Sequence, residues 1–126
     1  VKKKLFNPGF SIVAIDSIAG TFDISPANSI YGSGKAALAS FLKYVALEMA
    51  SKKIRVNTIS PGLILTPMHT NGTVEEEKLE EIMSKVPLGR WGIPEDISYA
   101  AVYLLSEASS YITGSDIKID GGVTLK

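Results

Sequence analysis

Residues 31–52, YGSGKAALASFLKYVALEMASK, decide the fold of this 126-residue chain. Alternating steps of four and three from Tyr31 reach Lys35 and then a series of apolar residues, which is the spacing of one helix face turned toward a core. We therefore predict a long helix that begins near residue 29 or 30 and ends near residue 52. Its core-facing stripe continues from Lys35 through Leu38, Leu42, Val45 and Met49.

The segments on either side of this helix have the composition of buried strands. Residues 10–16 (FSIVAID) form a short, nearly unbroken apolar run rich in β-branched side chains, and residues 54–60 (IRVNTIS) form a second strand. A strand, a helix and a strand in this order make a βαβ unit with parallel strands and a right-handed crossover. With a third strand over 115–119 (SDIKI), the sequence predicts an α/β fold around a parallel sheet.

Two shorter helices are predicted in the second half of the chain. Thr73-Val74-Glu75-Glu76 has the form of a capping box, which predicts a short acidic helix over about 74–85. Pro94 at a first helical position predicts a last helix that ends near residue 106. We expect residues 17–20 to form a turn, and residues 63–72 and 87–92 to form irregular loops. The last helix should face the core with Ile97, Ala101, Leu104 and Leu105.

The composition excludes several classes of function. Thirteen basic and thirteen acidic residues cancel, which gives no electrostatic case for nucleic acid or an anionic membrane as a partner. The chain has no cysteine and a single histidine, His69, so disulfides, thiolate chemistry and multi-histidine metal sites are excluded and no metal is expected. No apolar run reaches the ~18 residues of a membrane span. We expect one unit over residues 1–126 in the cytoplasm, although the chain opens on Val1 as though cut from something longer.

Tyr31 and Lys35 are the first candidates for chemistry. At i and i+4 on a helix their Cβ atoms lie roughly 5 to 6 Å apart. A phenol is a poor acid or base at neutral pH, but a neighbouring ammonium favours the phenolate, and the pair could then exchange a proton with a substrate. On this spacing alone, a core-edge tyrosine beside a surface lysine is the commoner explanation.

Three features of the sequence converge on one edge of the predicted sheet. Ser17 directly follows the strand over 10–16, and Pro61-Gly62 directly follows the strand over 54–60. Tyr31 begins the crossover helix, which starts at the same carboxyl edge. Open α/β sheets bind ligands at that edge, so we predict a crevice there.

The motifs along the chain resemble those of the short-chain dehydrogenase/reductase family. The resemblance implies the C-terminal portion of a Rossmann-type doubly wound parallel sheet whose N-terminal strands precede this chain, with residues 67–89 forming a substrate-side lobe. It covers nearly all of the chain, and its motifs follow one another in the family's order. They are Ser17-Ile18-Ala19-Gly20, Tyr31-Gly32-Ser33-Gly34-Lys35, Arg55-Val56-Asn57 with Pro61-Gly62-Leu63-Ile64-Leu65-Thr66-Pro67-Met68, Pro87-Leu88-Gly89-Arg90 with Pro94-Glu95-Asp96-Ile97, and Ile112-Thr113-Gly114 with Asp120-Gly121-Gly122.

The resemblance implies roles for individual residues. Tyr31 would act as the acid/base at the carbonyl or hydroxyl oxygen, and Lys35 would tune it and hold the nicotinamide ribose. Ser17 would polarise the substrate carbonyl. The remaining cofactor contacts would come from Pro61, Gly62, Ile64 and Thr66.

The implied function is an NAD- or NADP-dependent oxidoreductase that interconverts a carbonyl and an alcohol on a small molecule. Tyr-x-x-x-Lys favours this reaction over that of the related enoyl reductases, whose tyrosine and lysine are further apart, and 3-oxoacyl thioesters and sugars or polyols are both compatible substrates. In the family's pattern, the residues that choose between NAD and NADP would lie before this chain. The helix from Tyr31 would pack against a second copy in a homodimer or homotetramer. The alternative is a non-catalytic fragment or an oligomer-assembly module.

The chain departs from the family beside Ser17. Where the family commonly has Asn-x-Ser-Ser, this chain has Ala14-Ile15-Asp16-Ser17. The serine with the expected role is kept, and Asp16 adds a carboxylate next to it. We expect Asp16 to make a turn or helix-end hydrogen bond. The alternative is that its negative charge raises the pKa of Tyr31 and so opposes the effect of the lysine.

Overall fold

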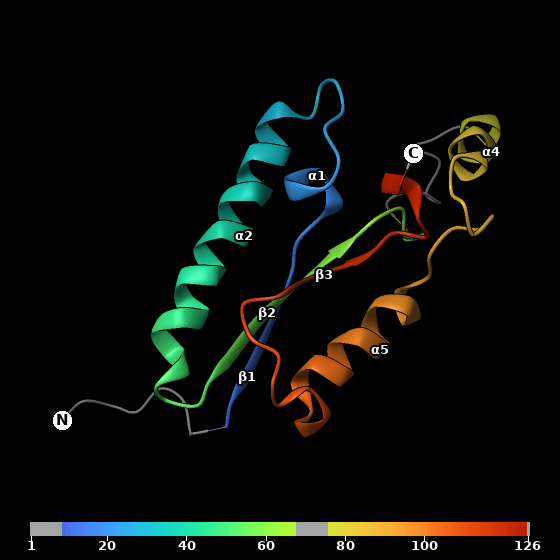
Figure 1. The fold of residues 1–126 in the computed structure, drawn as a ribbon. Coiled ribbons are helices and arrows are strands. Elements are labelled where there is room, and N and C mark those ends of the chain that lie inside the picture. The colour runs from blue at the N-terminus through green and yellow to red at the C-terminus, as the bar shows by residue number, and fades with distance from the viewer. Residues whose placement is uncertain (1–8, 68–75, 126) are drawn as a thin grey trace.

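The computed structural model describes residues 9–67 and 76–125, which fold around a parallel sheet with helices on both faces (Figure 1). The strands are β1 (Ser11–Ile15), β2 (Arg55–Pro61) and β3 (Asp116–Ile119), and they lie in the order β1-β2-β3. The register places Ile15 opposite Ile59 and Ile59 opposite Ile117. The predicted α/β class and all three predicted strands are confirmed.

The long helix α2 (Ser29–Ala50) connects β1 to β2 and covers one face of the sheet. Ala46 packs with Ile54 and Val56 in a buried cluster. The cluster is extended by Ile12 and by three members of the predicted stripe, Leu42, Val45 and Met49. Small residues at the closest approach let the helix lie near the sheet, as Ala39 and Ala46 are its buried residues.

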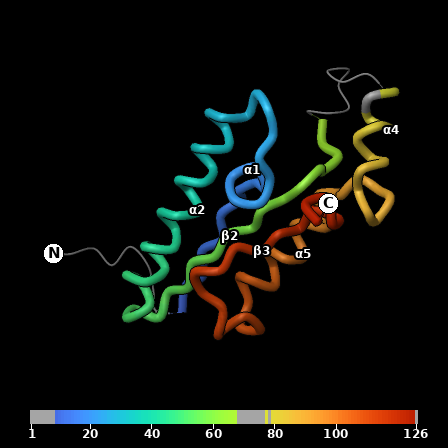
Figure 2. Tube along the Cα trace, turned by 45° about the horizontal axis from the view of Figure 1, so that its top comes forward, coloured from blue at the N-terminus to red at the C-terminus, as the bar shows by residue number. Residues whose placement is uncertain are grey.

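The helix α5 (Pro94–Leu105) covers the opposite face of the sheet (Figures 1 and 2). Leu104 is buried, and its carbonyl oxygen accepts hydrogen bonds from Ser11 Oγ at 2.8 Å and Arg55 Nη1 at 2.9 Å. The prediction that Leu105 faces the core is wrong, since this side chain is 52% exposed. One helical residue turns the side chain by about 100°, and Leu104 takes the core-facing position.

Residues 17–20 form a short helix rather than the predicted turn. The helix α1 (Ile18–Thr21) begins after Ser17, whose Oγ accepts a hydrogen bond from Ala19 N–H at 3.2 Å. This N-cap stabilises the first helical turn. The helix α1 lies against the start of α2, where a Cβ added to Gly20 would come within 2.9 Å of the backbone of Lys35 and Ala36.

The helix α4 (Glu76–Ser84) lies beyond the carboxyl end of the sheet, away from α2 (Figure 2). The predicted acidic helix is confirmed where it is described, whereas the proposed capping residue Thr73 lies outside the described residues. Short 3₁₀ turns, η1 (Glu107–Ser109) and η2 (Val123–Leu125), flank β3. Within residues 9–67 and 76–125, no helix combines the length and the apolar character needed to cross a membrane.

Candidate active site

An open cleft of about 640 Å³ lies at the carboxyl end of the sheet. The structure brings all the sequence-predicted site residues together on its walls, although they come from segments that are far apart in the chain. The end of β1 and the start of α2 provide three of them, and the end of β2 with the segment that follows it provides the other four. The predicted residues in the lining are Ser17, Tyr31, Lys35, Pro61, Gly62, Ile64 and Thr66.

Lys35 is held at the end of β1 and beneath the ring of Tyr31. Its Nζ donates hydrogen bonds to the carbonyl oxygens of Ile15 at 3.2 Å and Asp16 at 3.3 Å. The same atom lies 5.8 Å from the centroid of the Tyr31 ring. An ammonium group has three N–H donors, so two are used by the backbone and one remains for a group bound in the cleft.

Tyr31 lies in the first turns of α2 and opens to the cleft. Its side chain is 52% exposed, so a molecule in the cleft has access to the ring and its hydroxyl. Tyr31 and Lys35 lie one helical turn apart on α2, and both line the same cleft.

The hydroxyl oxygen of Ser17 accepts a hydrogen bond within the protein, and its proton is left to donate another. The oxygen accepts the Ala19 N–H of α1, as described above. A hydroxyl that accepts one hydrogen bond keeps its own proton for donation. Because Ser17 lines the cleft, that proton can be donated to an oxygen of a bound molecule.

The wall formed by the end of β2 is closely packed. Gly62 N–H donates to Ile119 O at 2.9 Å, and a Cβ at position 62 would come within 2.8 Å of Asp120 Cα. Ile64 pairs with Gly92 in an isolated bridge, which Leu65 N–H supports by donating to Gly92 O at 2.8 Å. These contacts fix the backbone that borders the cleft.

Asp16 lies on the floor of the cleft with its carboxylate buried. Its residue surface is 4% exposed, and Oδ1 lies 4.0 Å from Lys35 Nζ. No side chain in the described part of the chain donates a hydrogen bond to the carboxylate, whereas the backbone N–H of Ser17 interacts with it, which is the kind of turn contact expected for Asp16. Burial raises the pKa of Asp16 and the charge of Asp116 adds to this shift, while the Lys35 ammonium and the Ser17 N–H oppose it.

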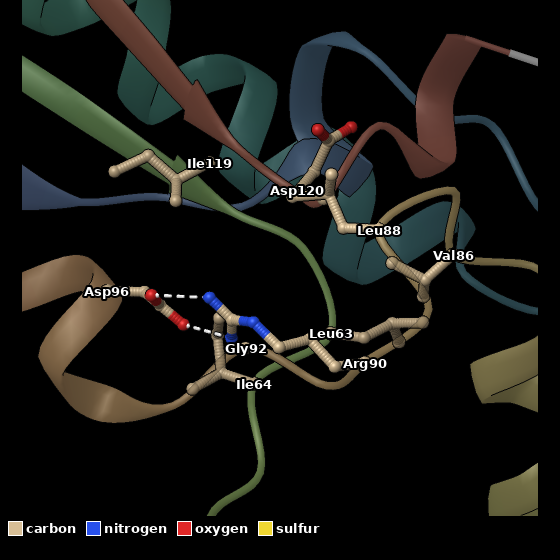
Figure 3. A pocket seen from close by; sticks show the side chains of 10 residues that line it. Leu63, Ile64, Val86, Leu88, Arg90, Gly92, Asp96, Ile119 and Asp120 are labelled. Carbon is tan, nitrogen blue, oxygen red and sulfur yellow. Dashed lines mark hydrogen bonds and ion pairs between the residues drawn. The ribbon is translucent and has the colours of Figure 1, made fainter.

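A second, smaller cavity of about 150 Å³ lies behind Ile64, which lines both cavities (Figure 3). Arg90 and Asp96 form a bidentate ion pair at its border, with Nη1 to Oδ2 at 2.7 Å and Nη2 to Oδ1 at 2.9 Å. The hydrogen bonds from Arg90 and from Ile93 N–H lower the pKa of Asp96 to about 2. This pair ties the loop before α5 to the first turn of the helix.

Comparison with known proteins identifies the family. The family model described as Enoyl-(Acyl carrier protein) reductase matches residues 1–124. A solved structure of a short-chain type dehydrogenase/reductase from Mycobacterium ulcerans is similar to this chain with a TM-score of 0.86 and 36% identity, over 94% of this chain and 42% of that one. This chain belongs to the short-chain dehydrogenase/reductase family.

Other members of the short-chain dehydrogenase/reductase family are similar over the same region. The 3-oxoacyl-[acyl-carrier-protein] reductase of Thermotoga maritima is 39% identical over 91% of this chain and 46% of its own length, and a tropinone reductase homologue of Arabidopsis thaliana is 43% identical over 91% of this chain and 43% of its own. A 4-hydroxyisoleucine dehydrogenase complexed with NADH has a TM-score of 0.85 and 37% identity over 92% of this chain and 47% of that one. The chain therefore spans about half the length of the curated relatives it matches.

Sequence reasoning missed the wall of the cleft that α5 contributes. Pro94, Ile97, Ser98 and Ala101 line the cleft opposite the residues of β2 and α2. Helical spacing predicted that Ile97 and Ala101 face inward, but spacing does not show which end of the sheet the helix N-terminus reaches.

Among the described residues, no group of three or more histidine, cysteine, aspartate or glutamate side chains is arranged to hold a metal ion.

Proposed function

We propose that the protein carrying this chain is an NAD- or NADP-dependent oxidoreductase that interconverts a carbonyl and an alcohol on a small molecule. The observation that carries the proposal is the convergence of Ser17, Tyr31 and Lys35 on one cleft, with the ammonium beneath the phenol ring. Family membership and the NADH-bound state of a structural relative support the nicotinamide cofactor.

The donor groups of the cleft fit a nicotinamide riboside. The remaining N–H of Lys35 and the Tyr31 hydroxyl suit the two hydroxyls of a ribose, and the backbone from Pro61 to Ile64, with the Thr66 side chain, would border the nicotinamide and its carboxamide. When bound, the nicotinamide supplies or accepts a hydride.

In the proposed reduction, Tyr31 gives its hydroxyl proton to the carbonyl oxygen, and the Lys35 ammonium stabilises the phenolate that remains. Ser17 donates a hydrogen bond to the same oxygen as negative charge develops on it. In the oxidation, the phenolate of Tyr31 takes the proton back from the alcohol. Each of these steps uses a group that lines the cleft.

We propose 3-oxoacyl thioesters as the first substrates to test. Several relatives are 3-oxoacyl-[acyl-carrier-protein] reductases, whereas the matching family model is described by the enoyl reductase reaction. The four-residue spacing from Tyr31 to Lys35 favours carbonyl reduction. We further propose residues 67–89 as a substrate-side lobe, since α4 lies beyond the carboxyl end of the sheet and Val86 and Leu88 line the cavity behind Ile64.

The Tyr31→Phe variant of the intact protein tests the proposal. We expect its rate of NAD(P)H oxidation with an acetoacetyl thioester to fall by at least ~100-fold, because proton transfer by a positioned side chain contributes about 10² to 10⁴. Tyr111→Phe is the matched control, since Tyr111 is fully exposed and should turn over as the parent does. Turnover of Tyr31→Phe within tenfold of the parent would contradict the assignment.

A second proposal concerns assembly. The face of α2 that points away from the sheet exposes large apolar side chains, and we propose that it packs against a second copy in a homodimer or homotetramer. The side chains are Ile30, Phe41, Tyr44 and Leu47. If this chain served only as an assembly module, the parent and Tyr31→Phe would show the same background oxidation of NAD(P)H.

A further inference from the structure

Asp16 carries a buried carboxylate to which the proposed reaction assigns no role. Its side chain is fully enclosed, and within residues 9–67 and 76–125 no side chain donates a hydrogen bond to either oxygen, which leaves the Ser17 backbone N–H as the neutral group that favours its charged form. Its backbone is fixed, because Asp16 N–H donates to Ile59 O at 2.7 Å where β1 ends. An enclosed carboxylate is costly unless a charge or a proton compensates it.

Lys35 is the cation that faces this carboxylate. Its Nζ lies 4.0 Å from Asp16 Oδ1, which is beyond a hydrogen bond but within the range of a strong Coulomb attraction. The Nζ also donates to the carbonyl oxygens of Ile15 and of Asp16 itself. All these attractions pull the ammonium toward the end of β1.

The other elements that pack around Asp16 add one like charge. Asp116 of β3 is paired in register with Thr58 of β2, and Thr58 is paired with the residue of β1 that lies two positions before Asp16. Paired residues share a face of the sheet, and so do alternate residues of a strand. Asp116 and Asp16 therefore project on the same side. Asp116 Oδ1 accepts a hydrogen bond from Ser60 Oγ at 2.7 Å, and its other oxygen has no partner in the described part of the chain. The residues of α1 carry no titratable side chain.

Lys118 is the second cation on this face, and other groups hold it. Its Nζ bonds to Thr124 Oγ1, lies 4.0 Å from Asp120 Oδ2 and lies 5.2 Å from the centroid of the Phe22 ring. Of the two lysines, Lys35 is therefore the one that is paired with Asp16.

We propose that Asp16 is a positioning residue for Lys35, whose carboxylate holds the ammonium at the end of β1 beneath the Tyr31 ring and releases it when the carboxylate takes up a proton. The family commonly has a serine here, so this chain would have a control of Lys35 that the serine cannot supply. The consequence for turnover rests on the proposed function, whereas the control of the Lys35 position does not.

The titration of Asp16 sets where this release occurs. Burial raises its pKa above the ordinary value of 3.8, with Lys35 opposing and Asp116 reinforcing the shift. Between the ordinary pKa and the raised one, the folded protein binds more protons than the unfolded chain, so its stability falls as the pH rises through this interval. Asp16→Asn should remove this loss of stability.

The position of Lys35 is tested without substrate, by the NMR signal of its Cε in the intact protein with ¹³C-labelled lysine. The signal is assigned by its loss in Lys35→Arg. We expect it to shift in acid with an inflection above 3.8, the ordinary value for the Asp16 carboxyl. The shift should vanish in Asp16→Asn and move to lower pH in Asp116→Asn, which removes a like charge. Asp23→Asn, the same change at an exposed site, should leave it unaltered.

The consequence for turnover is tested by the pH profile of kcat/KM. We expect the parent to lose activity in acid as Asp16 takes up its proton, and Asp16→Asn to lack this limb. Its kcat/KM at neutral pH should be about 10-fold to 100-fold lower, as for a small misplacement of a catalytic group. Asp16→Ser, the family's residue, gives the same readings if Asp16→Asn does not fold.

Each result decides between the two proposals. A Lys35 signal and a pH profile that are unchanged in Asp16→Asn, even with altered stability, would overturn the positioning role. A Lys35 signal that follows Asp16 in a protein without NAD(P)H-linked turnover would retain the positioning role and overturn the proposed function.

Discussion

Ser17 shows how a single hydroxyl can serve both the backbone and the cleft. Its oxygen caps α1 by accepting Ala19 N–H, and its own proton stays available for donation. Under the proposed function, the short helix holds this donor beside the cleft before any substrate arrives.

Replacing Ser17 with alanine should affect activity more than stability. Loss of an oxyanion donor costs about 10² to 10³ in kcat, and loss of an N-cap costs about 1 kcal/mol. We expect both changes in Ser17→Ala, measured by steady-state kinetics and urea unfolding of the intact protein. Ser40→Ala, at an exposed position of α2, should leave kcat unchanged and should not lower stability. A kcat near that of the parent, with only stability reduced, would leave Ser17 with the capping role alone.

Individual site residues could be predicted where the backbone alone determines their place. Ser17, Tyr31 and Pro61 each adjoin the end of a strand or the start of a crossover helix, and parallel strands bring those points to one edge. The burial of Asp16 could not be predicted in this way. It depends on α2 and on β3, which begins a hundred residues later in the chain.

At the scale of elements, the contact of α1 with α2 depends on glycine. A Cβ on Gly20 would meet the backbone of Lys35 and Ala36 at 2.9 Å, and a Cβ on Gly32 would meet Ala19 O at 2.8 Å. Backbone atoms cannot move aside as a flexible side chain does. The two helices would have to separate at the point from which Lys35 projects.

Gly20→Ala and Gly34→Ala should therefore have opposite effects on stability. Overpacking at residue 20 should lower the free energy of unfolding by about 1 to 3 kcal/mol and reduce turnover, because Lys35 shifts with α2. Residue 34 lies in the same helix with nothing within 4 Å of an added Cβ, so alanine there should stabilise by roughly 0.5 to 1 kcal/mol. Thermal unfolding of both variants measures the difference, and equal effects would contradict the close approach seen here.

The sequence predicted the elements more completely than their orientation. The stripe from Leu42 to Met49 identified the buried side of α2, because one long helix repeats its signal over many turns. The shorter α5 repeats it too few times to separate Leu104 from Leu105, and residues 17–20 were too few to show a helical period at all. The N-cap from Ser17 stabilises the helical conformation of that segment, and the formation of a cap depends on the local backbone geometry.

At the scale of the whole molecule, the outer face of α2 exposes an unusual amount of apolar surface. Phe41 and Leu47 are 62% and 77% exposed, and together with Ile30 and Tyr44 they form an apolar strip along the helix. Exposed apolar surface of this kind commonly marks an interface. The sheet presents a further open side, since among the described residues β1 pairs with β2 alone.

The double variant Phe41→Arg/Leu47→Arg tests the proposed assembly. Truncation of a hot-spot residue at the centre of an interface costs about 2 kcal/mol or more in association. We expect light scattering to show a dimer or tetramer for the parent and a smaller species for the variant. Tyr111→Arg, at a fully exposed site outside α2, should keep the parent's mass. An unchanged mass in the double variant would place the interface elsewhere.

Ile64 separates the cleft from the small cavity behind it, and its side chain belongs to the lining of both. Its backbone is tied to Gly92 in a bridge. The small cavity behind it is unfilled volume that larger side chains in its lining could occupy. Enlarging Val86 would fill part of the small cavity, and reducing Ile64 would join that cavity to the cleft. Under the proposed function, such changes would alter the room for a substrate without replacing Ser17, Tyr31 or Lys35.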